Sequence, residues 1–151
     1  MGNIFSERGK SDSKTRNASL EYEGLMLRIL LVEDNKADAR MIIEILKETK
    51  IEHELVWIND GEKALDHLGS GAFYDMFILD LNLPKASGLE ILSALRNMQK
   101  FQRTPVIVMT GSISPGDKLR TEGEDMVYFL VKPMTLEEID RTVLAIKKII
   151  S

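Results

Sequence analysis

The chain has 151 residues and a formal net charge of −4, and it contains no cysteine. With 44% hydrophobic and 29% charged residues, it has the composition of a soluble globular protein, and its length suits one folded domain but not two. The missing cysteines exclude disulfides and thiolate metal sites, and basic residues scattered among acidic ones give no positive surface for nucleic acid.

The first 25 residues are rich in serine, asparagine, glycine and charged side chains, and they show no apolar period. Such a segment cannot bury enough apolar surface to be fixed on a core. We therefore predict a flexible N-terminal extension over residues 1–25 and a folded domain over residues 26–151, with no output domain after it. Because no apolar run is long enough to cross a bilayer and no signal peptide is recognisable, we expect a cytoplasmic protein without a membrane partner.

Five short apolar runs follow this extension, and each has the length and content of a β-strand. They span residues 26–32, 53–59, 75–81, 105–110 and 126–131. Because these runs are apolar throughout and do not alternate with polar residues, they are typical of strands that are buried on both faces of a sheet.

Helical periodicity follows each of the first three strands and the last one. The first helix is predicted over residues 36–49, and the second is short and ends at Leu68. Ser87 and Thr135 each stand three residues before a glutamate, a capping-box spacing that predicts the starts of two further helices. The segment between the fourth and fifth strands is polar and interrupted by Pro115, so its helix should be short or poorly formed.

Strands that alternate with helices in this way predict an α/β fold with a doubly wound, five-stranded parallel sheet and helices on both faces. In such folds ligands bind beyond the carboxyl ends of the strands, near the point where the strand order reverses. The residues that end each strand are therefore the first candidates for a functional site.

Chemically useful side chains stand at four of these strand ends. The first strand finishes in Glu33 and Asp34, the third in Asp80, the fourth in Thr110 and the fifth in Lys132. Three carboxylates at one edge of a sheet repel one another, so they favour a hard divalent cation such as Mg²⁺ or a nearby ammonium group. Taken alone, each residue has an ordinary structural explanation, and it is their joint placement that indicates a site.

The chain lacks a glycine-rich phosphate loop, a serine nucleophile elbow and histidines at metal-binding spacing. Asp80, however, could itself act as a nucleophile. Formation of an aspartyl phosphate requires a metal to neutralise the incoming phosphoryl oxygens and an in-line approach. The candidate metal ligands at neighbouring strand ends fit that requirement.

Four motifs together resemble the receiver domain of two-component response regulators. They are LLVEDN at 30–35, ILDLNLPKASG at 78–88, VMTGS at 108–112 and VKP at 131–133. The resemblance covers residues 27–151 and is strongest to stand-alone receivers related to cyanobacterial phytochrome response regulators. It implies a flavodoxin-like sheet with the strand order 2-1-3-4-5.

The resemblance implies that Asp80 is the phosphoacceptor. It also implies that Mg²⁺ is held by Asp34, Asp80 and the backbone carbonyl of Asn82, with Glu33 acting through a bound water. A protein of this kind is a phosphoacceptor signalling domain and not an enzyme, since it catalyses only its own phosphorylation and autodephosphorylation.

Three further residues receive roles from the same resemblance. Thr110 and Lys132 would bind the phosphoryl oxygens, and the Lys132–Pro133 peptide bond would be cis. Phe129 occupies the position of an aromatic residue that, together with Thr110, switches its conformation on phosphorylation. The implied partners are a sensor histidine kinase or a hybrid kinase, which supplies the phosphoryl group from a phosphohistidine, and a downstream protein. The resemblance also allows a homodimer.

Two alternatives stay open at this point. The chain could be a phosphorylation-independent adaptor or a phosphate sink that drains a shared kinase. It could also be a phosphatase of the haloacid-dehalogenase type, which uses an aspartate nucleophile on an α/β sheet. The phosphatase is less favoured, because those enzymes resemble one another in a D-x-D motif on the first strand, whereas Asp80 lies on the third.

Overall fold

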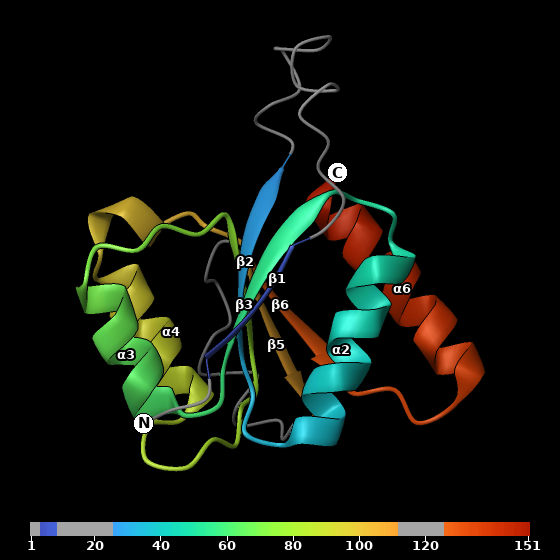
Figure 1. Cartoon of the computed structure of the whole chain (residues 1–151), viewed down its shortest axis with the longest axis horizontal. Helices are drawn as coiled ribbons and strands as arrows, with labels where there is room; N and C mark the ends of the chain where they lie inside the picture. Colours follow the sequence, from blue (N-terminus) through green and yellow to red (C-terminus); the bar gives the residue numbers. More distant parts are fainter. Residues whose placement is uncertain (1–3, 9–25, 112–125) are drawn as a thin grey trace, which may run out of the picture.

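The computed structural model describes residues 4–8, 26–111 and 126–151. Five parallel strands form the centre of the sheet (Figure 1). They are β2 (Leu27–Val32), β3 (His53–Ile58), β4 (Met76–Leu79), β5 (Val106–Thr110) and β6 (Val127–Val131). Their spatial order is β3-β2-β4-β5-β6, which is the order 2-1-3-4-5 when only the parallel strands are counted. The predicted α/β fold and its strand order are thus confirmed.

A sixth strand, β1 (Ile4–Arg8), extends the sheet beyond β3. It runs antiparallel to β3, with Ile4 opposite Ile58 and Arg8 opposite Glu54. The expectation of a flexible extension over residues 1–25 is therefore wrong for residues 4–8. An open sheet edge holds an extended segment through main-chain hydrogen bonds, and an argument from apolar content does not detect this.

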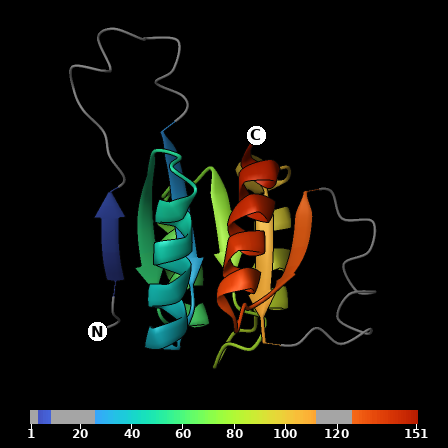
Figure 2. The ribbon, with the colours of Figure 1, turned by 90° about the vertical axis from the view of Figure 1, so that its right-hand side faces the viewer.

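The remainder of the predicted extension lies outside the described residues, and so does the weak helix predicted around Pro115. The helices that the structure describes cover both faces of the sheet, with α2 and α6 on one side and α3 and α4 on the other (Figures 1 and 2). Their bounds are Lys36–Glu48 for α2, Gly61–Gly69 for α3, Gly88–Arg96 for α4 and Leu136–Ile150 for α6, with a short 3-10 helix, η2, at Gln99–Phe101. None of these helices is long and apolar enough to cross a membrane.

Polar side chains cap the four α-helices that the structure describes, at the points where strand or loop turns into helix. Asn35, Asp60 and Ser87 each accept a hydrogen bond from the backbone amide three residues further on. Thr135 does the same and forms a complete capping box with Glu138. The helix starts predicted at Ser87 and Thr135 are therefore confirmed.

Each face of the sheet has its own apolar core. Alternate residues of β2 point to opposite faces, so that Leu30 packs toward α3 and α4 while Ile29 packs toward α2 and α6. Phe77 and Phe101 meet edge to face at 5.0 Å between ring centroids in the first of these cores. Burial on both sides explains why the strands are apolar throughout. It also fixes the register that brings the strand ends to one level.

Candidate functional site

Three carboxylates meet at the carboxyl ends of β2 and β4. Glu33, Asp34 and Asp80 each place an oxygen within 4.8 Å of the others. The two strands are neighbours in the sheet, and the amide of Asp80 donates to the carbonyl of Val32 at 3.0 Å, which holds both strand ends at the same height. Residues 46 positions apart in the sequence thus form one acidic cluster, as the strand-end analysis predicts.

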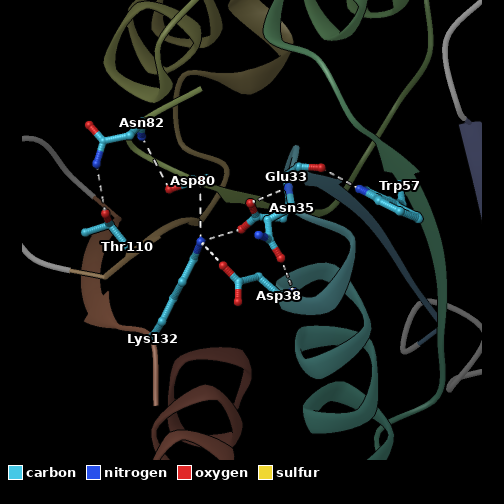
Figure 3. A network of polar contacts seen from close by, with 8 residues as sticks. All are labelled: Glu33, Asn35, Asp38, Trp57, Asp80, Asn82, Thr110 and Lys132. Carbon is cyan, nitrogen blue, oxygen red and sulfur yellow. Dashed lines mark hydrogen bonds and ion pairs between the residues drawn. The ribbon is translucent and has the colours of Figure 1, made fainter. Parts of the chain in front are cut away.

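Glu33 is the most enclosed member of this acidic cluster, with only 1% of its surface exposed. Its carbonyl accepts a hydrogen bond from Trp57 Nε1 at 2.7 Å, and its Oε2 accepts one from the Asn35 amide at 3.1 Å (Figure 3). Burial raises the pKa of Glu33 to about 7; the Lys132 ammonium and the Asn35 amide oppose this effect, and the charge of Asp80 adds to it.

Lys132 brings a positive charge into the cluster from the end of β6. Its Nζ lies 2.7 Å from Glu33 Oε1, 2.9 Å from Asp38 Oδ2 and 3.4 Å from Asp80 Oδ2 (Figure 3). Burial acts to lower the pKa of Lys132, but the hydrogen bond to Asp38 and the nearby negative charges of Glu33 and Asp80 raise it above its ordinary value. The ammonium group therefore stays charged throughout the physiological range.

The peptide bond between Lys132 and Pro133 is trans, since the described residues contain no cis peptide bond. The expectation of a cis bond at this position is wrong for this structure. The ammonium group reaches the carboxylates with this bond in the trans form. The amide of Lys132 donates a hydrogen bond to the carbonyl of Thr110 at 2.7 Å and so ties this backbone to β5.

Asn82 links the acidic cluster to Thr110. Its backbone amide donates to Asp80 Oδ1 at 3.3 Å, and its side-chain amide donates to Thr110 Oγ1 at 3.4 Å (Figure 3). Thr110 is buried, whereas Asn82 is exposed at the rim of the site. The hydroxyl that sequence analysis places on the fourth strand thus lies beside the loop that follows Asp80.

The backbone after Asp80 turns closely around Gly88, the first residue of α4. The amide of Gly88 donates to the carbonyl of Leu81 at 3.1 Å. A Cβ atom on Gly88 would lie only 2.3 Å from the carbonyl oxygen of Asp80, so no larger residue fits without a shift of the backbone. The glycine allows α4 to begin directly against the residue that carries the candidate nucleophile.

Phe129 lies on β6 and is half-buried against the core on the side of α3 and α4. It pairs with Val108 in the sheet register, and Thr110 follows two residues later on β5. Because residues two apart in a strand face the same way, Phe129 and Thr110 are on the same face of the sheet. Tyr128 packs toward the opposite core.

Asp38 is a site residue that the sequence analysis does not identify. It lies in the first turn of α2, and its amide donates to Oδ1 of Asn35 at 2.9 Å. An acidic residue in the first turn is common because it interacts favourably with the helix dipole. The sequence therefore gives no reason to expect its further contact with Lys132. Its place in the first helical turn directly after the acidic pair Glu33 and Asp34 is the signal that could have identified it as a site residue.

The acidic cluster has the donors that a hard divalent cation requires. Its three carboxylates supply oxygen ligands, which Mg²⁺ and Mn²⁺ prefer. Glu33 Oε1 is buried and has no hydrogen bond of good geometry in the part of the chain that the structure describes, although the Lys132 ammonium is close. An acidic oxygen in that position is suited to a cation or to a water bound to one.

The fold and this constellation of strand-end residues define a receiver domain. The model of the family described as response regulator receiver domain matches residues 29–144. The chain therefore belongs to the receiver domains of response regulators.

Its relatives include regulators from Methanothrix harundinacea and from Synechocystis sp.. The chain is 37% identical over 125 residues to the probable methanogenesis regulatory protein FilR2 of Methanothrix harundinacea, covering 80% of this chain and 81% of that protein. It is 35% identical over 125 residues to the response regulator Rcp1 of Synechocystis sp., covering 79% of this chain and 85% of that protein.

Two solved structures resemble the fold closely. The Mn²⁺-bound form of Rcp1 superposes with a TM-score of 0.71 at 34% identity and covers 81% of this chain and 92% of that one. The phosphorylated cyanobacterial phytochrome response regulator RcpA has a TM-score of 0.71 at 32% identity and covers 82% of this chain and 92% of that one. The similarity to cyanobacterial phytochrome response regulators that the motifs indicate is thus confirmed.

Proposed function

We propose that the protein is a phosphorylation-dependent signalling switch in which Asp80 accepts a phosphoryl group from the phosphohistidine of a sensor histidine kinase or a hybrid kinase. The observation that carries the proposal is the position of the Asp80 carboxylate, which lies among two further carboxylates and the Lys132 ammonium. The phosphorylated state of the related RcpA and the Mn²⁺ bound to the related Rcp1 support the same chemistry.

In the proposed reaction, a carboxylate oxygen of Asp80 attacks the phosphorus atom of the phosphohistidine. An O–P bond forms while the N–P bond breaks, and the bonding electron pair returns to the imidazole nitrogen of the kinase. Lys132 and the hydroxyl of Thr110 would bind the transferred phosphoryl oxygens, one as a cation and the other as a hydrogen-bond donor. Later attack by water on the phosphorus would release phosphate and regenerate the carboxylate.

Mg²⁺ is the cofactor that we propose for this step. Asp34, Asp80 and the backbone carbonyl of Asn82 would hold it, and Glu33 would contact it through a bound water. When bound, the cation would offset the charge that gathers as an anionic phosphoryl group approaches three carboxylates.

The output of the switch would be a changed protein-binding surface. Thr110 would move toward the phosphoryl group, and Phe129, on the same face of the sheet, would change its packing in response. Inverting a two-state population from rare to dominant requires about 5.5 kcal/mol of differential stabilisation. A dianion that contacts Lys132 and a divalent cation would supply that energy.

The test is phosphorylation by a small donor. The protein is incubated with Mg²⁺ and acetyl phosphate beside Asp80→Asn, and the intact masses are compared. Asp66→Asn is the matched control, because it makes the same change at an exposed carboxylate on α3. A phosphate-sized gain of mass in the wild type and in Asp66→Asn, but not in Asp80→Asn, supports the proposal. If the wild type gains no mass and does not respond to beryllofluoride, the proposal fails, and a phosphorylation-independent adaptor remains.

A further inference from the structure

Lys132 has as many acidic neighbours as it has protons to donate. An ammonium group carries three N–H donors and no acceptor. In this structure three carboxylate oxygens lie within 3.4 Å of Nζ, and they come from Glu33, Asp38 and Asp80 (Figure 3). The contact with Asp38 is a hydrogen bond, and those with Glu33 and Asp80 are ion pairs, so a phosphoryl oxygen that binds Lys132 competes with these carboxylates for the ammonium group.

The three carboxylates are not equivalent. Glu33 and Asp80 belong to the acidic cluster, so a cation bound there competes with Lys132 for their oxygens. On phosphorylation the carboxylate of Asp80 would also lose its own charge, because it becomes an acyl phosphate whose negative charge lies on the phosphoryl oxygens. Asp38 lies outside the acidic cluster, and neither event removes its charge.

The position of Asp38 is fixed by the start of α2. Asn35 accepts the hydrogen bond from the amide of Asp38, and the amide of Asn35 in turn donates to Glu33. The backbone between the acidic cluster and the first turn of α2 is thus held at both ends. This places Oδ2 of Asp38 2.9 Å from Nζ of Lys132, with about a third of the Asp38 side chain open to solvent.

We infer that Asp38 is a positioning residue that holds the Lys132 ammonium at the site when the cation and the phosphoryl group draw Glu33 and Asp80 away from it. This inference rests on the proposed function of Asp80, which it extends to a residue on a different element. Asp38 retains one N–H of Lys132, and the longest of the three contacts, at 3.4 Å to Asp80, is the one that a phosphoryl oxygen replaces. Asp38 itself contacts no phosphoryl oxygen.

The test measures beryllofluoride affinity in the presence of Mg²⁺ for the wild type, Asp38→Asn, Lys132→Met and the double variant. The single tryptophan, Trp57, donates to the carbonyl of Glu33 and so provides a fluorescence signal close to the site. Glu44→Gln is the matched control, since it removes one negative charge from an exposed position on the same helix. Thermal unfolding shows whether each variant is folded.

We expect Asp38→Asn to weaken beryllofluoride binding by about three- to tenfold, because it removes a hydrogen bond between charged groups that solvent partly screens. Glu44→Gln should have no effect on this affinity. In the Lys132→Met background, Asp38→Asn should cause no further loss, because the residue acts only through Lys132. A merely structural role would weaken binding equally in both backgrounds. Asp38→Ser provides a second variant in case Asp38→Asn unfolds, and it should show the same loss.

The outcomes separate this inference from the proposed function. If Asp38→Asn binds beryllofluoride as tightly as the wild type, or more tightly because a negative charge is gone, the inference is overturned while the proposed function stands. The same holds if the loss persists in the Lys132→Met background. If the wild type itself binds no beryllofluoride, both fail together.

Discussion

The indole nitrogen of Trp57 donates a hydrogen bond to the backbone carbonyl of Glu33 at 2.7 Å. Trp57 lies on β3, whereas Glu33 follows β2, so the contact ties the end of one strand to the neighbouring strand. It fixes the backbone at the point where the chain leaves the sheet and enters the acidic cluster. Glu33 is thereby held through its main chain, independently of what its carboxylate binds.

Replacing Trp57 by phenylalanine should destabilise the fold. The substitution leaves the carbonyl of Glu33 without this donor in a buried position, and an unsatisfied buried acceptor costs about 1–3 kcal/mol. Urea unfolding followed by circular dichroism measures the change, which does not depend on the fluorescence that the substitution removes. A free energy of unfolding equal to that of the wild type would show that water replaces the indole without cost.

Removing the proposed Mg²⁺ or one of its proposed ligands should weaken the cation-dependent properties of the site. We expect Asp34→Asn to weaken Mg²⁺ binding by more than about tenfold. Mutating a residue that only supports a metal ligand already costs at least about tenfold in metal affinity, and a direct ligand should cost more. Wild-type protein at a Mg²⁺ concentration 100 times the dissociation constant should gain about 2.7 kcal/mol in stability, and a chelator should reverse the gain. Thermal unfolding with and without Mg²⁺ measures both effects. An unchanged midpoint on addition of Mg²⁺ would exclude a cation site in the acidic cluster.

Alanine at position 88 should both destabilise the protein and disturb the site. A Cβ on Gly88 would lie 2.3 Å from the Asp80 carbonyl oxygen, and such overpacking typically costs about 1–3 kcal/mol. Gly69→Ala is the matched control, because a Cβ there meets nothing within 4 Å, so its effect should be neutral or slightly stabilising. Chemical unfolding and Mg²⁺ titration of both variants test this. Equal behaviour of the two would show that the loop after Asp80 yields without strain.

Asp60 should make the stability of the fold sensitive to acid. The hydrogen bond from the Lys63 amide, followed by the charge of Lys85, lowers the pKa of Asp60 despite its burial. The unfolded state therefore takes up a proton more readily than the folded state. The contribution of Asp60 is fully present above its ordinary pKa of about 3.9 and is lost as pH falls through the lower folded value.

Asp60→Asn keeps a helix cap but removes this titration. Between about pH 5 and pH 3, the free energy of unfolding should fall less steeply in Asp60→Asn than in the wild type, as urea titrations at each pH would measure. Glu62→Gln, at an exposed position in the same turn, serves as the control and should follow the wild type. Parallel curves for wild type and Asp60→Asn would show that Asp60 titrates alike in the folded and unfolded states.

The parallel sheet and most of the site could be predicted because both leave strong signals in the sequence. Strands that are buried on both faces are apolar without interruption, so a polar residue such as Asp80 stands out where a strand ends. In a parallel sheet the carboxyl ends lie on one edge, and the positions of Glu33, Thr110 and Lys132 follow from that rule. The register that sets their distances follows from the two cores.

Two features could not be predicted, because one leaves almost no signal in the sequence and the other leaves a signal that has a common structural explanation. The strand β1 is held by backbone pairing with the edge of β3, which requires no particular side chains. The contact between Asp38 and Lys132 joins a helix start to the last strand, and a first-turn aspartate is common for reasons that involve no partner. Such contacts emerge only when the elements are assembled in space.

The long sequence distance between Lys132 and Asp38 has a consequence for the newly made chain. The two residues are 94 positions apart, and every carboxylate that surrounds the ammonium is synthesised before it. Until β6 docks, the acidic cluster has no lysine to offset its repulsion, and contacts between residues so distant in sequence form slowly. A partly made chain that ends before β6 would hold the proposed nucleophile, Asp80, without the lysine that we propose binds the phosphoryl group. Chemical competence would thus arrive together with completion of the sheet.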